Sequence, residues 1–308
     1  MSVFSRPFVS TAIARSLQAA TGAGATRMAV SARGRLPEFV ADIEKLEVPT
    51  RVGTAKITIY RAANASSPTG ALPAVHINLH GGGYVLALTD MDDPVCRALA
   101  VQSGSVVINV DYVVAPQHPF PAPSDQVFEV MEWVAANGEQ NGWDGSRLTI
   151  GGQSAGGGLA AAVARLAFER GGPRIALQVL HYPPLDLSVA AGSKRSPIAR
   201  PMLRPWMGEV YDTAYVPDPG ARTDRLVSPA GAADRADLTG IAPAVIVAAE
   251  QDILRDEARR YADRLDAAGS LVEYREVAGS DHGYDLKDDE RARNSYRFIA
   301  AHIRQTTA

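Results

Sequence analysis

The chain has 308 residues, of which 46% are hydrophobic and 21% are charged, and its formal net charge is -3 at pH 7. Acidic and basic residues are mixed along the chain, which excludes the clustered basic face that nucleic acids or anionic membranes require. No apolar run reaches the ~18 residues that could span a bilayer, so we expect no integral membrane contact. The N-terminal residues lack the apolar block of a secretory signal, and the one cysteine, Cys96, permits no intramolecular disulfide. We therefore expect a cytoplasmic protein in which Cys96 is a small buried hydrophobe.

Short β-branched runs alternate with helical stretches along the chain, which is typical of a mostly parallel sheet covered by helices. The expected strands lie at residues 56–60, 75–79, 106–110, 148–151, 176–180, 244–248 and 271–276. After an amphipathic helix near the N-terminus, the expected helices lie at residues 94–102, 123–136, 155–169, 256–268 and 290–304. The pattern predicts the α/β class, with a mostly parallel central sheet flanked by helices.

Two segments interrupt this alternation. We predict that residues 1–45 form the N-terminal part of a helical cap and residues 188–228 a cap insertion, while residues 46–187 and 229–308 form the two parts of the α/β core. A solvated crossover loop is the alternative for the second segment. We favour the cap because residues 205–215 read as a helix whose Trp206 and Met207 would be costly to leave in water.

A predicted strand at residues 148–151 runs directly into Gly152-Gln153-Ser154-Ala155-Gly156 and then into an alanine-rich helix. This strand, turn and helix are the context that a G-x-S-x-G nucleophile elbow requires. The flanking glycines let the strand and helix pass closely around a strained serine. Ser154 is therefore the candidate nucleophile. The alternative is a glycine-rich turn that only packs a helix on the sheet.

A second glycine-rich segment, His80-Gly81-Gly82-Gly83, follows another predicted strand. Consecutive glycines can turn backbone N–H groups toward one point, as acyl transfer needs where the carbonyl oxygen becomes an oxyanion. The N–H groups of Gly81 and Gly82, with that of Ala155, form the candidate oxyanion hole. A flexible loop is the alternative. A phosphate-binding loop is disfavoured, because the segment has neither the Lys-Ser/Thr ending of a P-loop nor the G-x-G-x-x-G register of a dinucleotide site.

A serine hydroxyl is a weak nucleophile until a base takes its proton, and a carboxylate must orient that base. Among the six histidines, His282 is the candidate base because its loop, after the last predicted strand, can carry the imidazole over the elbow. His181, at a strand end, is its main rival. Asp252 is the candidate carboxylate, since it gives the order serine, aspartate, histidine. Asp281 is the alternative, although adjacent side chains in a loop generally diverge.

Together these segments resemble the hormone-sensitive-lipase-like carboxylesterases (bacterial family IV) of the α/β-hydrolase superfamily. The resemblance is carried by residues 80–83, 110–121, 152–157, 252–257 and 282–284, in the family's order and spacing. It implies a triad, an oxyanion hole, a two-part cap, no cofactor, and short- to medium-chain acyl esters as small-molecule substrates. The implied triad is Ser154, Asp252 and His282, and the implied oxyanion donors are Gly81, Gly82 and Ala155. The resemblance also suggests a homodimer formed through an edge strand and its flanking helix.

The chain departs from the family pattern at a few positions near these motifs. The family usually has Arg-Leu at Val113-Val114 and Glu at Gln117. An acidic residue or threonine is common at Gln153, and asparagine is common at Gly158. These departures leave the implied triad intact and bear on the hydrogen bonds that surround it.

We therefore predict a serine carboxylesterase that works through an acyl-enzyme and holds no metal ion. An amidase or deacetylase with the same triad is the first alternative, because the sequence does not separate the two kinds of bond. A non-catalytic ligand-binding protein on this fold is the second, and it is disfavoured because such proteins typically lose a triad member. The residues expected to contact substrate are Tyr84, His181, Tyr182, Trp206 and Met207, with simple packing as the alternative for the first three.

Overall fold

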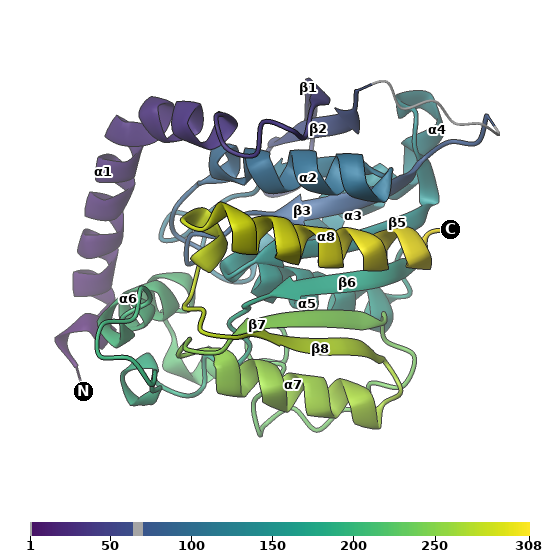
Figure 1. Cartoon of the computed structure of the whole chain (residues 1–308). Coiled ribbons are helices and arrows are strands. Elements are labelled where there is room, and N and C mark those ends of the chain that lie inside the picture. Colours follow the sequence, from purple (N-terminus) through teal and green to yellow (C-terminus); the bar gives the residue numbers. More distant parts are fainter. Residues whose placement is uncertain (1, 64–69) are drawn as a thin grey trace.

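The computed structural model describes residues 2–63 and 70–308, within which eight strands form one sheet (Figure 1). The strands are β1 (Ala41–Val48), β2 (Ala55–Ala62), β3 (Ala74–Leu79), β4 (Val106–Asp111), β5 (Asp144–Gln153), β6 (Ile175–His181), β7 (Ala244–Ala249) and β8 (Leu271–Val277). Their order across the sheet is β1-β2-β4-β3-β5-β6-β7-β8. β2 pairs antiparallel with β1 and β4, and the other neighbouring pairs are parallel.

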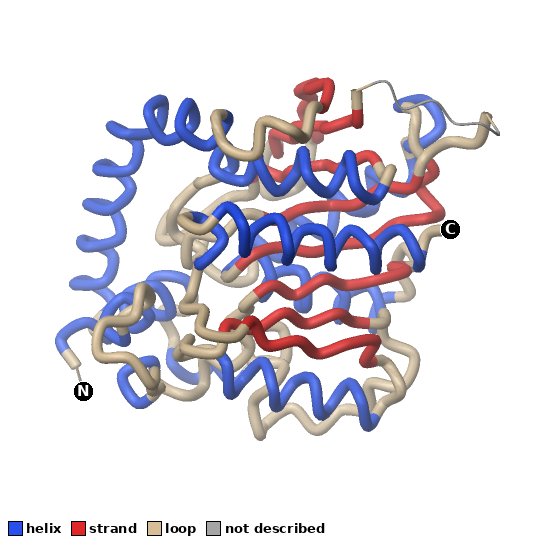
Figure 2. Tube along the Cα trace, viewed as in Figure 1, coloured by secondary structure: helices blue, strands red, loops and turns tan. Residues whose placement is uncertain are grey.

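Helices cover both faces of the sheet (Figure 2). α2 (Asp93–Ser103) and α8 (Asp289–Thr306) pack with one buried cluster, while α3 (Ala122–Ala136), α5 (Ala155–Arg170) and α7 (Arg255–Ala267) contribute to another. Neighbouring residues of β7 belong to different clusters. Val245 packs in the cluster with α2 and α8, and Ile246 packs in the cluster with α3, α5 and α7. Successive strand residues point to opposite faces, so the two clusters are the cores on either side of the sheet. The short helix α4 (Gly138–Asn141) precedes β5.

Two helices lie together beyond the edge of the sheet at which the parallel strands end, namely α1 (Pro7–Arg33) and α6 (Pro205–Tyr215) (Figure 1). A short 3₁₀ helix, η1 (Val3–Ser5), also contacts α6. The Phe4 and Trp206 rings pack there with centroids 5.6 Å apart. Gln18 ties α1 to the core, because its Nε2 donates to the carbonyl oxygens of Val85 (2.8 Å) and Ala115 (3.0 Å).

The seven predicted strands and the five helices predicted for the core are all present, and residues 205–215 form α6 as expected. The predicted N-terminal helix is longer than its apolar pattern suggested and continues to Arg33. β1 was not predicted. It begins at Ala41, inside the segment assigned to the cap, and pairs with β2 over its whole length. Across residues 2–63 and 70–308, no helix combines the length and apolar character needed to cross a membrane.

Candidate active site

The turn between β5 and α5 holds Ser154 in a strained backbone conformation. Its φ is +51° and its ψ is -122°, a region that residues other than glycine rarely occupy and that is found mainly at functional sites. The approach of α5 to the sheet is close, because a Cβ on Gly156 would collide with the carbonyl group of Leu79. Ser154 therefore stands at the tip of a sharp strand-to-helix turn that glycine makes possible.

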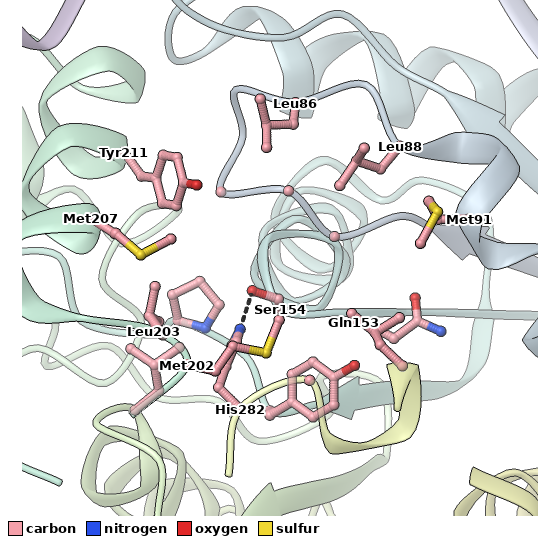
Figure 3. Close-up of a pocket in the computed structure, with 18 of the residues that line it drawn as sticks. Leu86, Leu88, Met91, Gln153, Ser154, Met202, Leu203, Met207, Tyr211 and His282 are labelled. Carbon is pink, nitrogen blue, oxygen red and sulfur yellow. Dashed lines mark hydrogen bonds between the residues drawn. The ribbon is translucent and has the colours of Figure 1, made fainter. Parts of the chain in front are cut away.

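Three side chains form a hydrogen-bonded line beyond the ends of β5, β7 and β8. His282 Nε2 lies 2.9 Å from Ser154 Oγ, as Figure 3 shows, and His282 Nδ1 lies 2.6 Å from Asp252 Oδ2. The other carboxylate oxygen of Asp252 accepts a hydrogen bond from the N–H of Leu254 at 3.1 Å. The three residues are far apart in sequence, and they meet because parallel strands present their carboxyl ends at one edge of the sheet.

The environment of His282 suits a base. Burial lowers its pKa, but the charge and hydrogen bond of Asp252 outweigh burial, so the pKa of His282 lies above its ordinary value. His181 differs, since burial lowers the pKa of His181 to about 4. Its Nε2 lies 2.8 Å from the Tyr284 hydroxyl, and its backbone carbonyl accepts the N–H of Ser154 at 2.9 Å. His181 thus contacts the serine turn through its backbone carbonyl. Of the two histidines, only His282 forms a hydrogen bond with the Ser154 hydroxyl.

Backbone N–H groups of the glycine loop lie beside Ser154. A Cβ on Gly81 would come within 3.6 Å of the Ser154 Cβ, and Gly82 has a φ of +119° that favours glycine. Within the described residues, the N–H groups of Gly81 and Gly82 donate to no other group of the protein. Ala155 opens α5, where N–H groups lack a partner in the helix and the helix dipole favours negative charge. Gly81 and Ala155 thus lie beside Ser154, and the role of these N–H groups as an oxyanion hole stays a prediction.

The glycine loop is held by two buried aromatic residues. The rings of His80 and Tyr112 stack with centroids 4.2 Å apart. The Tyr112 hydroxyl donates to the His80 carbonyl oxygen at 2.7 Å, and His80 Nδ1 lies 2.6 Å from the Gly81 carbonyl oxygen. The loop is therefore fixed before any substrate arrives, which is what donors to an oxyanion need.

A cavity of about 310 Å³ opens at Ser154. Figure 3 shows Met207 and Tyr211 on one side of Ser154, and Leu88 and Met91 on the other. Most of its walls are apolar side chains, and Ser154 and a few charged side chains supply the polar groups. An apolar cleft with a few convergent polar groups is typical of a small-molecule site.

Three of the five residues expected to contact substrate line this cavity, namely Tyr84, Tyr182 and Met207. His181 and Trp206 are not among the described residues that line the cavity, and contact with substrate stays a prediction for all five. His181 is directed toward Tyr284, and Trp206 is 37% exposed and packs on Phe4. Neighbours on a helix point in different directions, so α6 presents Met207 to the cavity and Trp206 to its outer surface.

The sequence did not indicate the role of Asp281. Its Oδ1 accepts the N–H of His282 at 2.7 Å, and its Oδ2 accepts the N–H of Met202 at 2.6 Å. The carboxylate thus joins the histidine loop to the segment before α6. Its position next to the histidine was visible in the sequence, but its partner at Met202 comes from a segment whose course the sequence left open. Among the described residues, no group of three or more His, Cys, Asp or Glu side chains could hold a metal ion.

Comparison with known proteins agrees with this geometry. Residues 76–286 match the model of a family described by the alpha/beta hydrolase fold. The chain belongs to this family. The predicted fold class is therefore confirmed, and the glycine loop, the serine turn and the histidine loop all lie within the matched residues.

Relatives of this α/β-hydrolase chain include named esterases. It is 38% identical over 213 residues to the carboxylesterase NlhH of Mycobacterium tuberculosis, a match that covers 69% of this chain and 66% of the relative. It is 34% identical over 250 residues to an ethyl acetate hydrolase of Pseudomonas putida, covering 80% and 76%. The structure resembles that of an esterase of Pyrobaculum calidifontis, with a TM-score of 0.83, 30% identity, and coverage of 95% and 92%. The chain spans about two thirds of the length of the mycobacterial relative.

Proposed function

We propose that this chain is a serine carboxylesterase that hydrolyses short- to medium-chain acyl esters through an acyl-enzyme. The observation that carries the proposal is the line of hydrogen bonds from Ser154 Oγ through His282 to Asp252, at the mouth of a mostly apolar cavity. The esterase relatives support the same reaction class. A metal ion or organic cofactor has no step to perform in this scheme.

The reaction follows from the positions of the groups. Ser154 Oγ attacks the ester carbonyl carbon while His282 Nε2 accepts the hydroxyl proton. The oxyanion that forms is stabilised by the N–H groups of Gly81, Gly82 and Ala155. His282 then protonates the leaving alcohol, which leaves the acyl group on Ser154. A water molecule deprotonated by His282 attacks this acyl-enzyme and releases the acid.

The two segments predicted as a cap have a role in this proposal. α6 and the residues before it supply Met202, Leu203 and Met207 to the cavity wall, and α1 packs against α6. We propose that they set the length and shape of the ester that reaches Ser154.

The homodimer stays a prediction, and edge strand β8 with exposed backbone groups is available for it. The cytoplasmic location also stays a prediction.

The test is hydrolysis of p-nitrophenyl esters with acyl chains of two to sixteen carbons, by the wild type and by Ser154→Ala. We expect cleavage of the shorter chains by the wild type, with a burst of nitrophenol that is lost in the variant. Each ester is paired with the matching anilide, because faster cleavage of the amide would replace the esterase by an amidase. A folded wild type that binds these esters without any turnover would instead favour a ligand-binding protein.

A further inference from the structure

Two charged side chains that line the cavity belong to one part of the chain, Lys194 from the segment between β6 and α6, and Asp212 from α6 itself. Both residues are almost fully buried, with 9% of Lys194 and 8% of Asp212 exposed. The reaction proposed above uses neither residue. Charged groups are rarely buried without partners, so this pair calls for a physical explanation.

Lys194 is firmly held in place. Its Nζ forms an ion pair of 2.5 Å with Glu257 Oε2 and donates to the Asp186 carbonyl oxygen at 2.9 Å. Glu257 is fixed in turn, because its Oε1 accepts the N–H of Leu185 at 2.8 Å. An ammonium group has three N–H donors, and these contacts use two of them. Among the described residues, the third donor has no partner in the protein, and Lys194 lines the cavity.

Asp212 has no such partners. Among the described residues, its carboxylate accepts no hydrogen bond and forms no ion pair within 4.0 Å. Burial raises the pKa of Asp212 to about 7, even though Lys194 and Arg222 act in the opposite direction. A carboxylate without a partner in the protein is unfavourable unless water or a ligand supplies the missing donor. Asp212 lines the cavity, so that donor can come from a bound molecule.

We propose that Lys194 and Asp212 form a subsite for a hydroxyl group carried on the ester substrate. A hydroxyl can accept a hydrogen bond from the Lys194 ammonium and donate one to the Asp212 carboxylate, so that it satisfies both. An anionic group would be repelled by Asp212, a cationic group by Lys194, and a plain alkyl end would leave both unsatisfied. Most of the other residues that line the cavity are apolar, Leu203 and Met207 among them, so a plain hydrocarbon chain between the ester and the hydroxyl fits its walls.

The inference rests on the proposed esterase function, and its test uses matched substrates. Hydrolysis of p-nitrophenyl alkanoates is compared with that of their ω-hydroxy forms, in four-, six- and eight-carbon versions. A second set compares alkyl acetates with ω-hydroxyalkyl acetates of the same lengths. The first set places the hydroxyl on the acyl side and the second on the alcohol side. In one of the sets, we expect kcat/KM to favour a hydroxylated ester by about tenfold, the effect of one hydrogen bond to a charged group.

Variants of Asp212 connect this preference to the subsite. Asp212→Leu removes the carboxylate at similar volume, and we expect it to abolish the preference while plain esters are still cleaved. Asp212→Asn keeps the shape, offers a second readout if the leucine variant does not fold, and should reduce the preference several-fold because the hydrogen bond loses its charge. Glu209→Gln is the matched control. Glu209 lies on the same helix, is not among the described residues that line the cavity, and its variant should keep the preference.

The failure of the subsite can be told apart from the failure of the esterase. Plain esters that are cleaved with no gain from a hydroxyl at any length would overturn the subsite and leave the esterase standing. If no ester is cleaved, calorimetric titration of Ser154→Ala with ethyl 6-hydroxyhexanoate and ethyl hexanoate still decides the question. Equal affinities for the two would overturn the subsite, and tighter binding of the hydroxy ester that Asp212→Leu removes would support it.

Discussion

The substitution Asp252→Asn tests how much the hydrogen bond between Asp252 and His282 contributes to the reaction. Asp252 is 3% exposed, and its Oδ2 lies 2.6 Å from His282 Nδ1. An asparagine would fit the same space without the negative charge. Its amide group can also donate to Nδ1, which would place the imidazole proton on Nε2 and leave Nε2 unable to accept the proton of Ser154.

The expected magnitude follows from the loss of both effects. The imidazolium that forms in the transition state would lose the charge that stabilises it, and part of the enzyme would hold the wrong tautomer. We expect kcat to fall by about 10³- to 10⁴-fold, or about 4 to 5 kcal/mol of barrier. The pKa of His282 should fall as well, because burial lowers it and Asp252 would no longer oppose burial. Residual activity should therefore extend to more acidic pH than in the wild type.

The assay is kcat and kcat/KM for a short p-nitrophenyl ester between pH 5 and 9, with Asp281→Asn as the matched control. Asp281 is adjacent to the histidine but accepts backbone N–H groups only. Its variant should lose less than tenfold in kcat, since the His282 imidazole keeps its partner. A large loss in Asp281→Asn, with little loss in Asp252→Asn, would refute the reasoning and assign the carboxylate of the triad to Asp281.

Three further predictions follow from single features of the structure. His282 must be neutral to accept a proton, and its pKa is raised above the ordinary value of a histidine. The kcat/KM of the wild type should therefore fall tenfold per pH unit below a midpoint that lies above that ordinary value, and a midpoint below the ordinary value would contradict this. Gly156→Ala should prevent stable folding, because the new Cβ would collide with the Leu79 carbonyl oxygen. In Gly22→Ala the new Cβ meets no atom within 4 Å, so this variant should raise the free energy of unfolding in urea by about 0.5 to 1 kcal/mol through a more stable α1. Cys96 is fully buried, and burial raises the pKa of its thiol, so a thiol reagent should label it only when the protein unfolds.

The sheet was predictable from the sequence because its central strands are short, β-branched and buried. β1 was not, for a physical reason. It is an edge strand in which half of the residues are charged, and five of its eight residues are exposed. A strand of this kind has neither the apolar alternation nor the continuous apolar run by which strands are recognised. Its place in the sheet depends on pairing with β2, which is a contact in space and not a property of the segment.

The same distinction applies within the candidate site. Ser154 and the glycine loop belong to segments whose local sequence dictates their geometry, so motifs were sufficient to find them. The cavity wall depends on how α6 sits over the sheet. Trp206 and Met207 are adjacent in sequence and equally apolar, yet one lies outside and the other inside. The pair Lys194 and Asp212 could not be predicted for the same reason, because a lysine and an aspartate 18 positions apart form no recognisable sequence motif.

Two of the departures from the family pattern, Gln117 and Gly158, are explained by contacts that the sequence could not show. Gln117 exchanges two hydrogen bonds with Gln18 of α1, at 2.9 and 3.1 Å, and a glutamate in its place could only accept. Gly158 faces the hydroxyl of Tyr84, which would collide with any Cβ at that position, and the Pro184 carbonyl oxygen would be only 2.8 Å away. Tyr84 stacks on Tyr215 with centroids 3.9 Å apart, so it cannot easily move aside. Because Tyr84 lines the cavity and leaves no space for a Cβ at position 158, the glycine at 158 is a consequence of the tyrosine at 84.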